Sequence, residues 1–127
     1  MIVAGLGCRR GTGAPEIEAA LAEALRLAGH AAGEVRCLAT STRKGGERGI
    51  ARAAERLGLP LVLVPDAELD AAAARAETRS ERVRALFGVP SVAEAAALAG
   101  AGPAARLLGP RLVLGPATCA LAAEIAT

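Results

Sequence analysis

Short apolar runs alternate with segments of helical periodicity along most of this chain, and that order limits the folds open to it. Five runs are long and apolar enough to be strands: 2–6, 34–39, 61–64, 111–115 and 117–122. Strands that are apolar at nearly every position are typical of parallel sheets covered by helices on both faces. We therefore expect a three-layer α/β/α fold with a mainly parallel sheet of about five strands. The last two strands, joined at Gly115-Pro116, should form an antiparallel hairpin at one edge.

Helix signals occupy the segments between these runs. Pro15 suits the first turn of a helix that Gly29 should end, and Gly58 should end a second helix. Three further helices are expected over 66–76, 78–87 and 91–99. The last two start with capping-box spacing, Thr78 with Glu81 and Ser91 with Glu94, and we interpret these pairs as helix caps.

Length and composition narrow the class of protein. A chain of 127 residues fits one domain, 1–127. It has one Phe and neither Trp nor Tyr, and its net charge is only +2, so it lacks the stacking platforms and concentrated charge of nucleic-acid binders. Its most apolar late stretch, 95–105, is interrupted by glycine and proline, so we expect no membrane span.

The cysteines and the histidine indicate a compartment and exclude one kind of site. Cys8, Cys37 and Cys119 are scattered and odd in number, which favours reduced thiols in the cytoplasm. No signal peptide is recognisable. The single histidine, His30, follows a helix-ending glycine, where interaction with the helix dipole is the simpler role. With one histidine and three scattered cysteines, we expect no metal cluster.

Two polar loops follow the first two predicted strands, and ligands of open α/β sheets bind at that end of the strands. The loops span Gly7–Gly13 and Thr40–Gly46 and contain no acidic residue. Their cations and hydroxyls are Arg9, Arg10, Thr12, Thr40, Ser41, Thr42, Arg43 and Lys44. Such donors favour an anion-binding cleft, and the alternative is a pair of solvated polar loops.

The kind of anion is limited by what these loops lack. Gly5, Gly7 and Gly11 are spaced too widely for a dinucleotide fingerprint, and Thr40 stands where that fold has a ribose-binding acid. Gly11-Thr12 has no P-loop lysine. A substrate with several carboxylates fits these donors better than a nucleotide does.

Lys44 is the only lysine among 15 basic residues, which suggests that a compact ammonium is needed there. Glu47 lies three residues further and can pair with it if a helix has begun. The alternative is an ordinary exposed ion pair.

Cys8 stands beside Arg9 and Arg10, a setting that favours a thiolate, although a packing role is the simpler interpretation.

The segment Gly5–Thr12 (GLGCRRGT) resembles the opening of the CobE and CbiG C-terminal family of cobalamin-biosynthesis proteins. Similar blocks follow in the same order: Leu38–Thr40 with Lys44, Glu47 and Gly49, then Leu57–Leu61, Thr78 and Ser80, Gly88–Ala95, and Ala117-Thr118. The chain departs from the family pattern at Gly13, at Arg79 and at Arg111, where the family often has lysine. Because the first motif follows Met1 closely, the chain is similar to the stand-alone CobE form rather than the fused CbiG form.

This resemblance implies a role in building the corrin ring, in one of two ways. The protein either binds a polycarboxylated precorrin or corrin intermediate, or opens the lactone ring of a precorrin and releases acetaldehyde, as fused CbiG proteins do. In the second case Lys44 would orient a carboxylate, Glu47 would activate water, and the Gly7–Gly13 amides would stabilise an oxyanion. No cofactor of its own is implied, since any cobalt enters with the substrate; other corrin-pathway enzymes are possible partners. The expected substrate-binding residues are Gly7, Cys8, Arg9, Arg10, Gly11, Thr12, Thr40, Ser41, Thr42 and Ser80.

Overall fold

The computed structural model describes residues 1–42, 47–79 and 92–124. Six strands are present: β1 (Ile2–Cys8), β2 (Val35–Ser41), β3 (Leu61–Val64), β4 (Ala105–Leu107), β5 (Leu112–Leu114) and β6 (Ala117–Glu124). The helices are α1 (Ala14–Ala28), α2 (Arg48–Leu57), α3 (Asp66–Arg79) and α5 (Val92–Ala101), with a 3₁₀ turn, η1, at Ala32–Glu34. The mixed α/β class expected from the sequence is confirmed.

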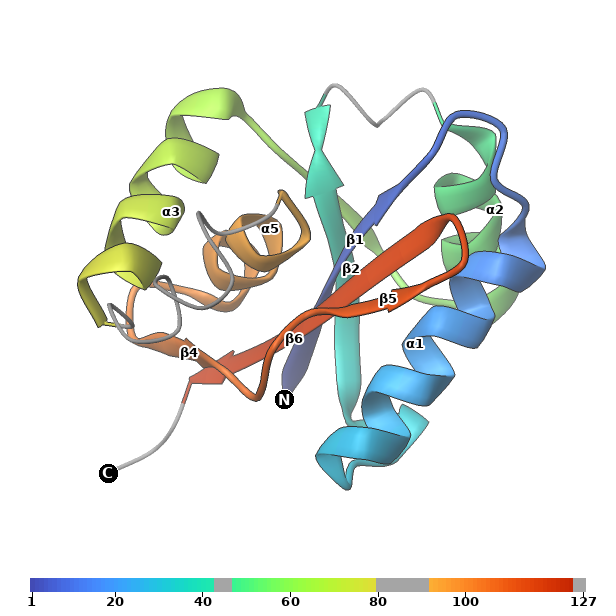
Figure 1. Ribbon diagram of the computed structural model, residues 1–127, viewed down its shortest axis with the longest axis horizontal. Coiled ribbons are helices and arrows are strands. Elements are labelled where there is room, and N and C mark those ends of the chain that lie inside the picture. Colours follow the sequence, from blue (N-terminus) through green and yellow to red (C-terminus); the bar gives the residue numbers. More distant parts are fainter. Residues whose placement is uncertain (43–46, 80–91, 125–127) are drawn as a thin grey trace.

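The strands form one sheet in the order β3-β2-β1-β6-β4, with β5 also paired to β6 (Figure 1). β1, β2 and β3 are parallel to one another. The C-terminal strand β6 lies antiparallel to β1, β4 and β5, so it joins the hairpin directly to the parallel core. The sequence did not indicate β4, because Arg106 interrupts its three residues and they form no apolar run.

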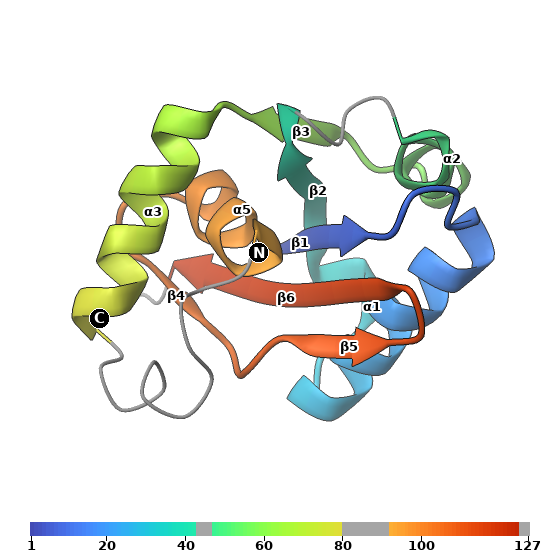
Figure 2. The ribbon, with the colours of Figure 1, turned by 45° about the horizontal axis from the view of Figure 1, so that its top comes forward.

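Helices cover both faces of the sheet, which Figure 2 shows with α1 and α2 on one side and α3 and α5 on the other. The first face has the larger side chains, among them Leu6, Ile17 and Leu38. The second face is packed mainly with alanines. At Gly5 the backbone of α5 approaches so closely that an added Cβ would lie 1.9 Å from the Ala93 carbonyl oxygen. The absence of a side chain at Gly5 therefore allows α5 to lie directly on β1.

Several predicted boundaries are corrected by strand pairing. Gly7 and Cys8 were expected in a loop, but β1 continues through them because they pair with Thr118 and Ala117 of β6. Thr40 and Ser41 were also expected in a loop, and they belong to β2 because β3 pairs with them. Those partners are distant in sequence, which is why local patterning ended both strands too early.

The predicted ends of two helices are confirmed by left-handed glycines: Gly29 (φ 75°) closes α1 and Gly58 (φ 69°) closes α2. The helix expected over 66–76 extends as α3 to Arg79, so Thr78 is in α3 rather than at the start of a new helix. Residues 80–87 of the predicted 78–87 helix lie outside the described residues. So does Ser91, the predicted cap of the following helix. Within the described part, no helix is long and apolar enough to cross a membrane.

Candidate functional site

The segments that follow β1 and β2 meet at the carboxyl end of the sheet, as the parallel pairing of the two strands requires. The Gly11 N–H donates to Oε2 of Glu47 over 3.4 Å, a long hydrogen bond between the two segments. Gly49, in the first turn of α2, packs on the Thr12 carbonyl. The prediction that these two segments are neighbours is therefore confirmed for the residues that the structure describes.

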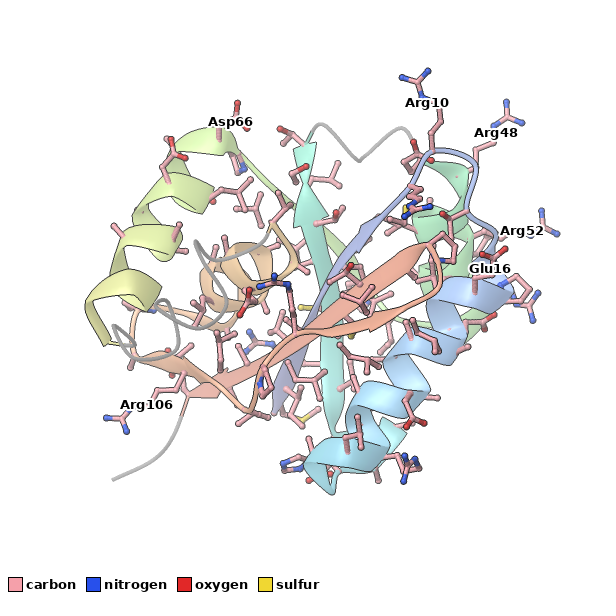
Figure 3. The ribbon with its side chains drawn as sticks, in the orientation of Figure 1. Arg10, Glu16, Arg48, Arg52, Asp66 and Arg106 are labelled. Atoms are coloured by element: carbon pink, nitrogen blue, oxygen red, sulfur yellow. The ribbon has the colours of Figure 1, made fainter. Side chains whose placement is uncertain are left out.

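Where they meet lies a depression of about 560 Å³, which we call the arginine hollow. Its lining is Arg10, Gly11, Thr12, Gly13, Ala14, Glu47, Arg48, Gly49 and Arg52. Arg48 and Arg52 stand one turn apart on α2, and Arg10 reaches the same region from the loop after β1 (Figure 3). Among the described residues, none of these three arginines forms an ion pair. The three guanidinium groups thus border one depression together with the Glu47 carboxylate.

A second depression, of about 370 Å³, lies at the carboxyl end of β1 beside the β5–β6 turn, and we call it the valine hollow. Its lining is Gly7, Cys8, Arg9, Val92, Ala93, Arg111, Val113, Gly115, Pro116 and Thr118. The Arg9 N–H donates to the Pro116 carbonyl over 3.0 Å, which ties the end of β1 to that turn. The consecutive residues Arg9 and Arg10 thus line different hollows.

Arg111 is held in place by an ion pair with Glu94. Its Nη1 donates to Glu94 Oε1 over 3.0 Å, and the side chains are 29% and 6% exposed. The sequence suggested only a capping role for Glu94. The structure shows this ion pair, which joins α5 to the start of β5, and the predicted cap stays a prediction because Ser91 lies outside the described residues.

The predicted hydroxyl donors are placed differently from the cations. The Thr40 hydroxyl donates to the Leu6 carbonyl over 2.8 Å, and the Thr12 hydroxyl donates to the Arg9 carbonyl over 2.6 Å. Thr40 and Ser41 are buried and line neither hollow, whereas Thr42 is exposed. The hydroxyls of Thr40 and Thr12 therefore bind the backbone and shape the two segments.

The remaining predicted residues divide between the two hollows. Gly7, Cys8 and Arg9 line the valine hollow, and Arg10, Gly11 and Thr12 line the arginine hollow with Glu47. Lys44 and Ser80 lie outside the described residues, as does Arg43.

Sequence reasoning missed five residues of these hollows that have charged or large apolar side chains: Arg48, Arg52, Val92, Arg111 and Val113. Arg48 and Arg52 come after Glu47 and are four residues apart from each other. That spacing could have placed the two arginines on one helix face. Val113 and Arg111 gave no such signal, because only the pairing of β5 with β6 brings them to the carboxyl end of β1. Within the described residues, no group of acidic, histidine and cysteine side chains could hold a metal ion.

The fold and these hollows define an α/β protein with exposed arginines at the carboxyl ends of its parallel strands. Comparison with known proteins gives the family. The family model described as Cobalamin synthesis G C-terminus matches residues 2–122. The chain is 41% identical over 121 residues to Protein CobE of a Sinorhizobium species, covering 95% of this chain and 79% of that protein. It therefore belongs to the family of the CbiG C-terminal domain and CobE, and it is a cobalamin biosynthesis protein.

Two crystal structures share the fold along almost the whole chain. One is the cobalamin biosynthesis protein chiG from Agrobacterium tumefaciens, with 45% identity, a TM-score of 0.83, and 98% of each chain covered. The other is CobE, described as a protein from the cobalamin (vitamin B12) biosynthetic pathway. It is 36% identical, with a TM-score of 0.81, and the match covers 96% of this chain and 89% of that chain.

Proposed function

We propose that this protein binds a polycarboxylated precorrin or corrin intermediate of cobalamin biosynthesis. The observation that carries the proposal is the arginine hollow, where Arg10, Arg48 and Arg52 border one depression without ion pairs among the described residues. Corrin intermediates carry acetate and propionate side chains, and a guanidinium is a good partner for a carboxylate because its two N–H groups match the two oxygens. Membership of the family supplies the pathway.

The site of binding is the end of the sheet rather than its faces. Both faces are covered by helices, whereas Arg10 and Gly11 in the segment after β1 and Thr42 in the segment after β2 are exposed. The sequence-based candidates Lys44, Thr42 and Ser80 remain part of this proposal. Any cobalt enters with the intermediate. The three cysteines are free thiols, which supports the reducing cytoplasm as the compartment.

Opening of a precorrin lactone is the alternative function. It would need Glu47 to act as a base on water, and the Glu47 carboxylate lines the arginine hollow while accepting the Gly11 N–H. Incubation with a lactone-containing precorrin and an acetaldehyde assay tests this alternative. Acetaldehyde release that is lost in Glu47→Gln would assign the chain as a hydrolase. Binding without release would leave it as a binding protein.

Titration with cobyrinic acid, a corrin with free carboxylate side chains, tests the binding itself. The double variant Arg48→Ala/Arg52→Ala should bind at least about tenfold more weakly than wild type, since hydrogen bonds to charged groups contribute about 1.5 kcal/mol or more. Added salt should weaken the wild type more than the double variant. Arg106→Ala controls for the loss of one exposed positive charge, because Arg106 is exposed on β4 at the far side of the molecule (Figure 3). Equal affinity of the double variant and wild type would reject the arginine hollow.

A further inference from the structure

The valine hollow differs from the arginine hollow in having large apolar side chains at its surface. Val92 on α5 is 48% exposed and Val113 on β5 is 61% exposed, and both line it together with Pro116. The arginine hollow is lined by arginines, glycines, one glutamate, one threonine and one alanine. Two neighbouring depressions at one end of the sheet therefore offer different chemistry to a ligand.

Two cations border the apolar surface of the valine hollow. Arg9 is exposed and comes directly after β1, and Arg111 comes directly before β5. The contact between Arg111 Nη1 and Glu94 Oε1 occupies one side of the guanidinium. A guanidinium has five N–H donors in a fixed fork, so a partner on one side leaves donors for a second carboxylate. Glu94 thereby acts as a positioning residue that fixes where those donors point.

We propose that the valine hollow receives an apolar edge of the corrin ring, with Val92 and Val113 in contact with the ring and Arg9 and Arg111 bound to two of its carboxylates. This inference rests on the proposed function and adds the orientation of the ligand. The supporting observation is the combination of exposed β-branched side chains with two guanidinium groups around one depression. A ring with carboxylate arms presents apolar surface and negative charge together, whereas a small polyanion such as citrate presents only negative charge.

The dimensions agree with a shared ligand. A volume of about 370 Å³ accommodates part of a macrocycle, and typical small-molecule sites are about 300–1,000 Å³. Because Arg9 and Arg10 are adjacent in the chain, one ligand can contact both hollows. The remaining carboxylates of a ring held by the valine hollow then fall near Arg10, Arg48 and Arg52.

Titration of single variants with cobyrinic acid and with citrate tests the inference. Val113→Thr keeps the branched shape of the side chain and replaces one methyl group by a hydroxyl. It should weaken cobyrinic acid binding about fourfold, from the contribution of one buried carbon, and leave citrate binding unchanged. Val62→Thr is the matched control, because Val62 is a 39% exposed strand valine on β3 that lines neither hollow. Arg9→Ala should weaken cobyrinic acid binding about tenfold, while Arg106→Ala should match wild type.

The outcomes separate this inference from the proposed function. If Val113→Thr and Arg9→Ala bind cobyrinic acid as wild type does while Arg48→Ala/Arg52→Ala binds weakly, the protein binds corrins but the valine hollow takes no part. If wild type does not bind cobyrinic acid, both proposals fall. Equal losses in Val113→Thr and Val62→Thr would also overturn the inference, because the effect would then not be local. Thermal unfolding of each variant confirms that these exposed substitutions leave the fold intact.

Discussion

Gly49 lies against the carbonyl of Thr12, so closely that a Cβ added to Gly49 would stand 2.0 Å from that oxygen. This contact brings the start of α2 onto the segment that follows β1 and so assembles the arginine hollow from two parts of the chain. The side chain of Ile17 would meet the same Cβ at 3.1 Å. No movement of a flexible side chain alone can make room, because the nearest atom belongs to the backbone.

Gly49→Ala should therefore destabilise the protein by about 3 kcal/mol, the upper part of the range for overpacking. It should also weaken corrin binding, because α2 must move away from the loop that holds Arg10. Urea unfolding and cobyrinic acid titration measure the two effects. Gly33→Ala is a suitable control, since an added Cβ there meets nothing within 4 Å. Unchanged stability in Gly49→Ala would show that the packing of α2 on Thr12 adapts freely.

The ion pair of Arg111 with Glu94 gives a second prediction. Removal of one partner from a buried pair costs several kcal/mol, and removal from an exposed pair costs less than about 1 kcal/mol. With Glu94 6% exposed and Arg111 29% exposed, Arg111→Ala should destabilise the protein by about 2 kcal/mol. Arg111→Lys should retain most of the stability because it keeps a cation beside Glu94. The free energies of unfolding of both variants check this.

A double-mutant cycle isolates the pair. Arg111→Ala/Glu94→Ala should be less destabilised than the sum of the two single variants, because the double change leaves no charge without its partner. Strict additivity would mean that the two side chains contribute independently.

The sequence was sufficient for the features that depend on local patterning. The helix ends at Gly29 and Gly58 need only a residue that tolerates positive φ, and the meeting of Gly11 with Glu47 follows from two adjacent parallel strands. The sequence was insufficient where the length of a strand depends on pairing with residues far away in the chain. Cys8 belongs to a strand because Ala117 pairs with it from the other end of the chain.

The candidate site likewise contains some residues that local sequence identifies and others that only tertiary packing brings together. The arginines of the loop after β1 were identified from the sequence because they follow a recognisable strand. Glu94 on α5 and Arg111, directly before β5, are 17 residues apart, and only the packing of α5 on the sheet brings them together. Only the tertiary structure could assign that ion pair.

The buried thiol of Cys119 should make the free energy of unfolding depend on pH in the alkaline range. Burial raises the pKa of this thiol from 9.0 to about 12 because the thiolate would lose its hydration. Between these two values the unfolded chain has released the proton and the folded chain still holds it, so the free energy of unfolding should fall with rising pH by up to about 1.4 kcal/mol per unit. Below pH 9 this contribution should be fully present and constant.

Urea unfolding of wild type and Cys119→Ala between pH 8 and pH 11 measures this contribution. The decline should be steeper in wild type, since the variant has no thiol at this position, and the absence of tyrosine simplifies the comparison. Parallel slopes for the two proteins would show that Cys119 does not account for the loss of stability.

The last prediction concerns Lys44, the only lysine of the chain and a residue of the segment between β2 and α2. It follows from the sequence alone, since Lys44 lies outside the described residues. Lys44→Ala should leave the free energy of unfolding within about 0.5 kcal/mol of wild type, as is usual for surface substitutions. It should weaken cobyrinic acid binding by about 1–3 kcal/mol, the range for a hydrogen bond to a charged group.

The conservative variant distinguishes the chemistry of the ammonium from its charge. Lys44→Arg keeps the positive charge but replaces a compact donor by a planar fork, so it should restore only part of the lost affinity. Arg106→Ala again controls for the general loss of one positive charge, and thermal unfolding of each variant controls for folding. Full restoration by Lys44→Arg would mean that only charge is needed at this position. Equal affinity of Lys44→Ala and wild type would remove Lys44 from the site and leave the arginines of the two hollows as the cations that bind the ligand's carboxylates.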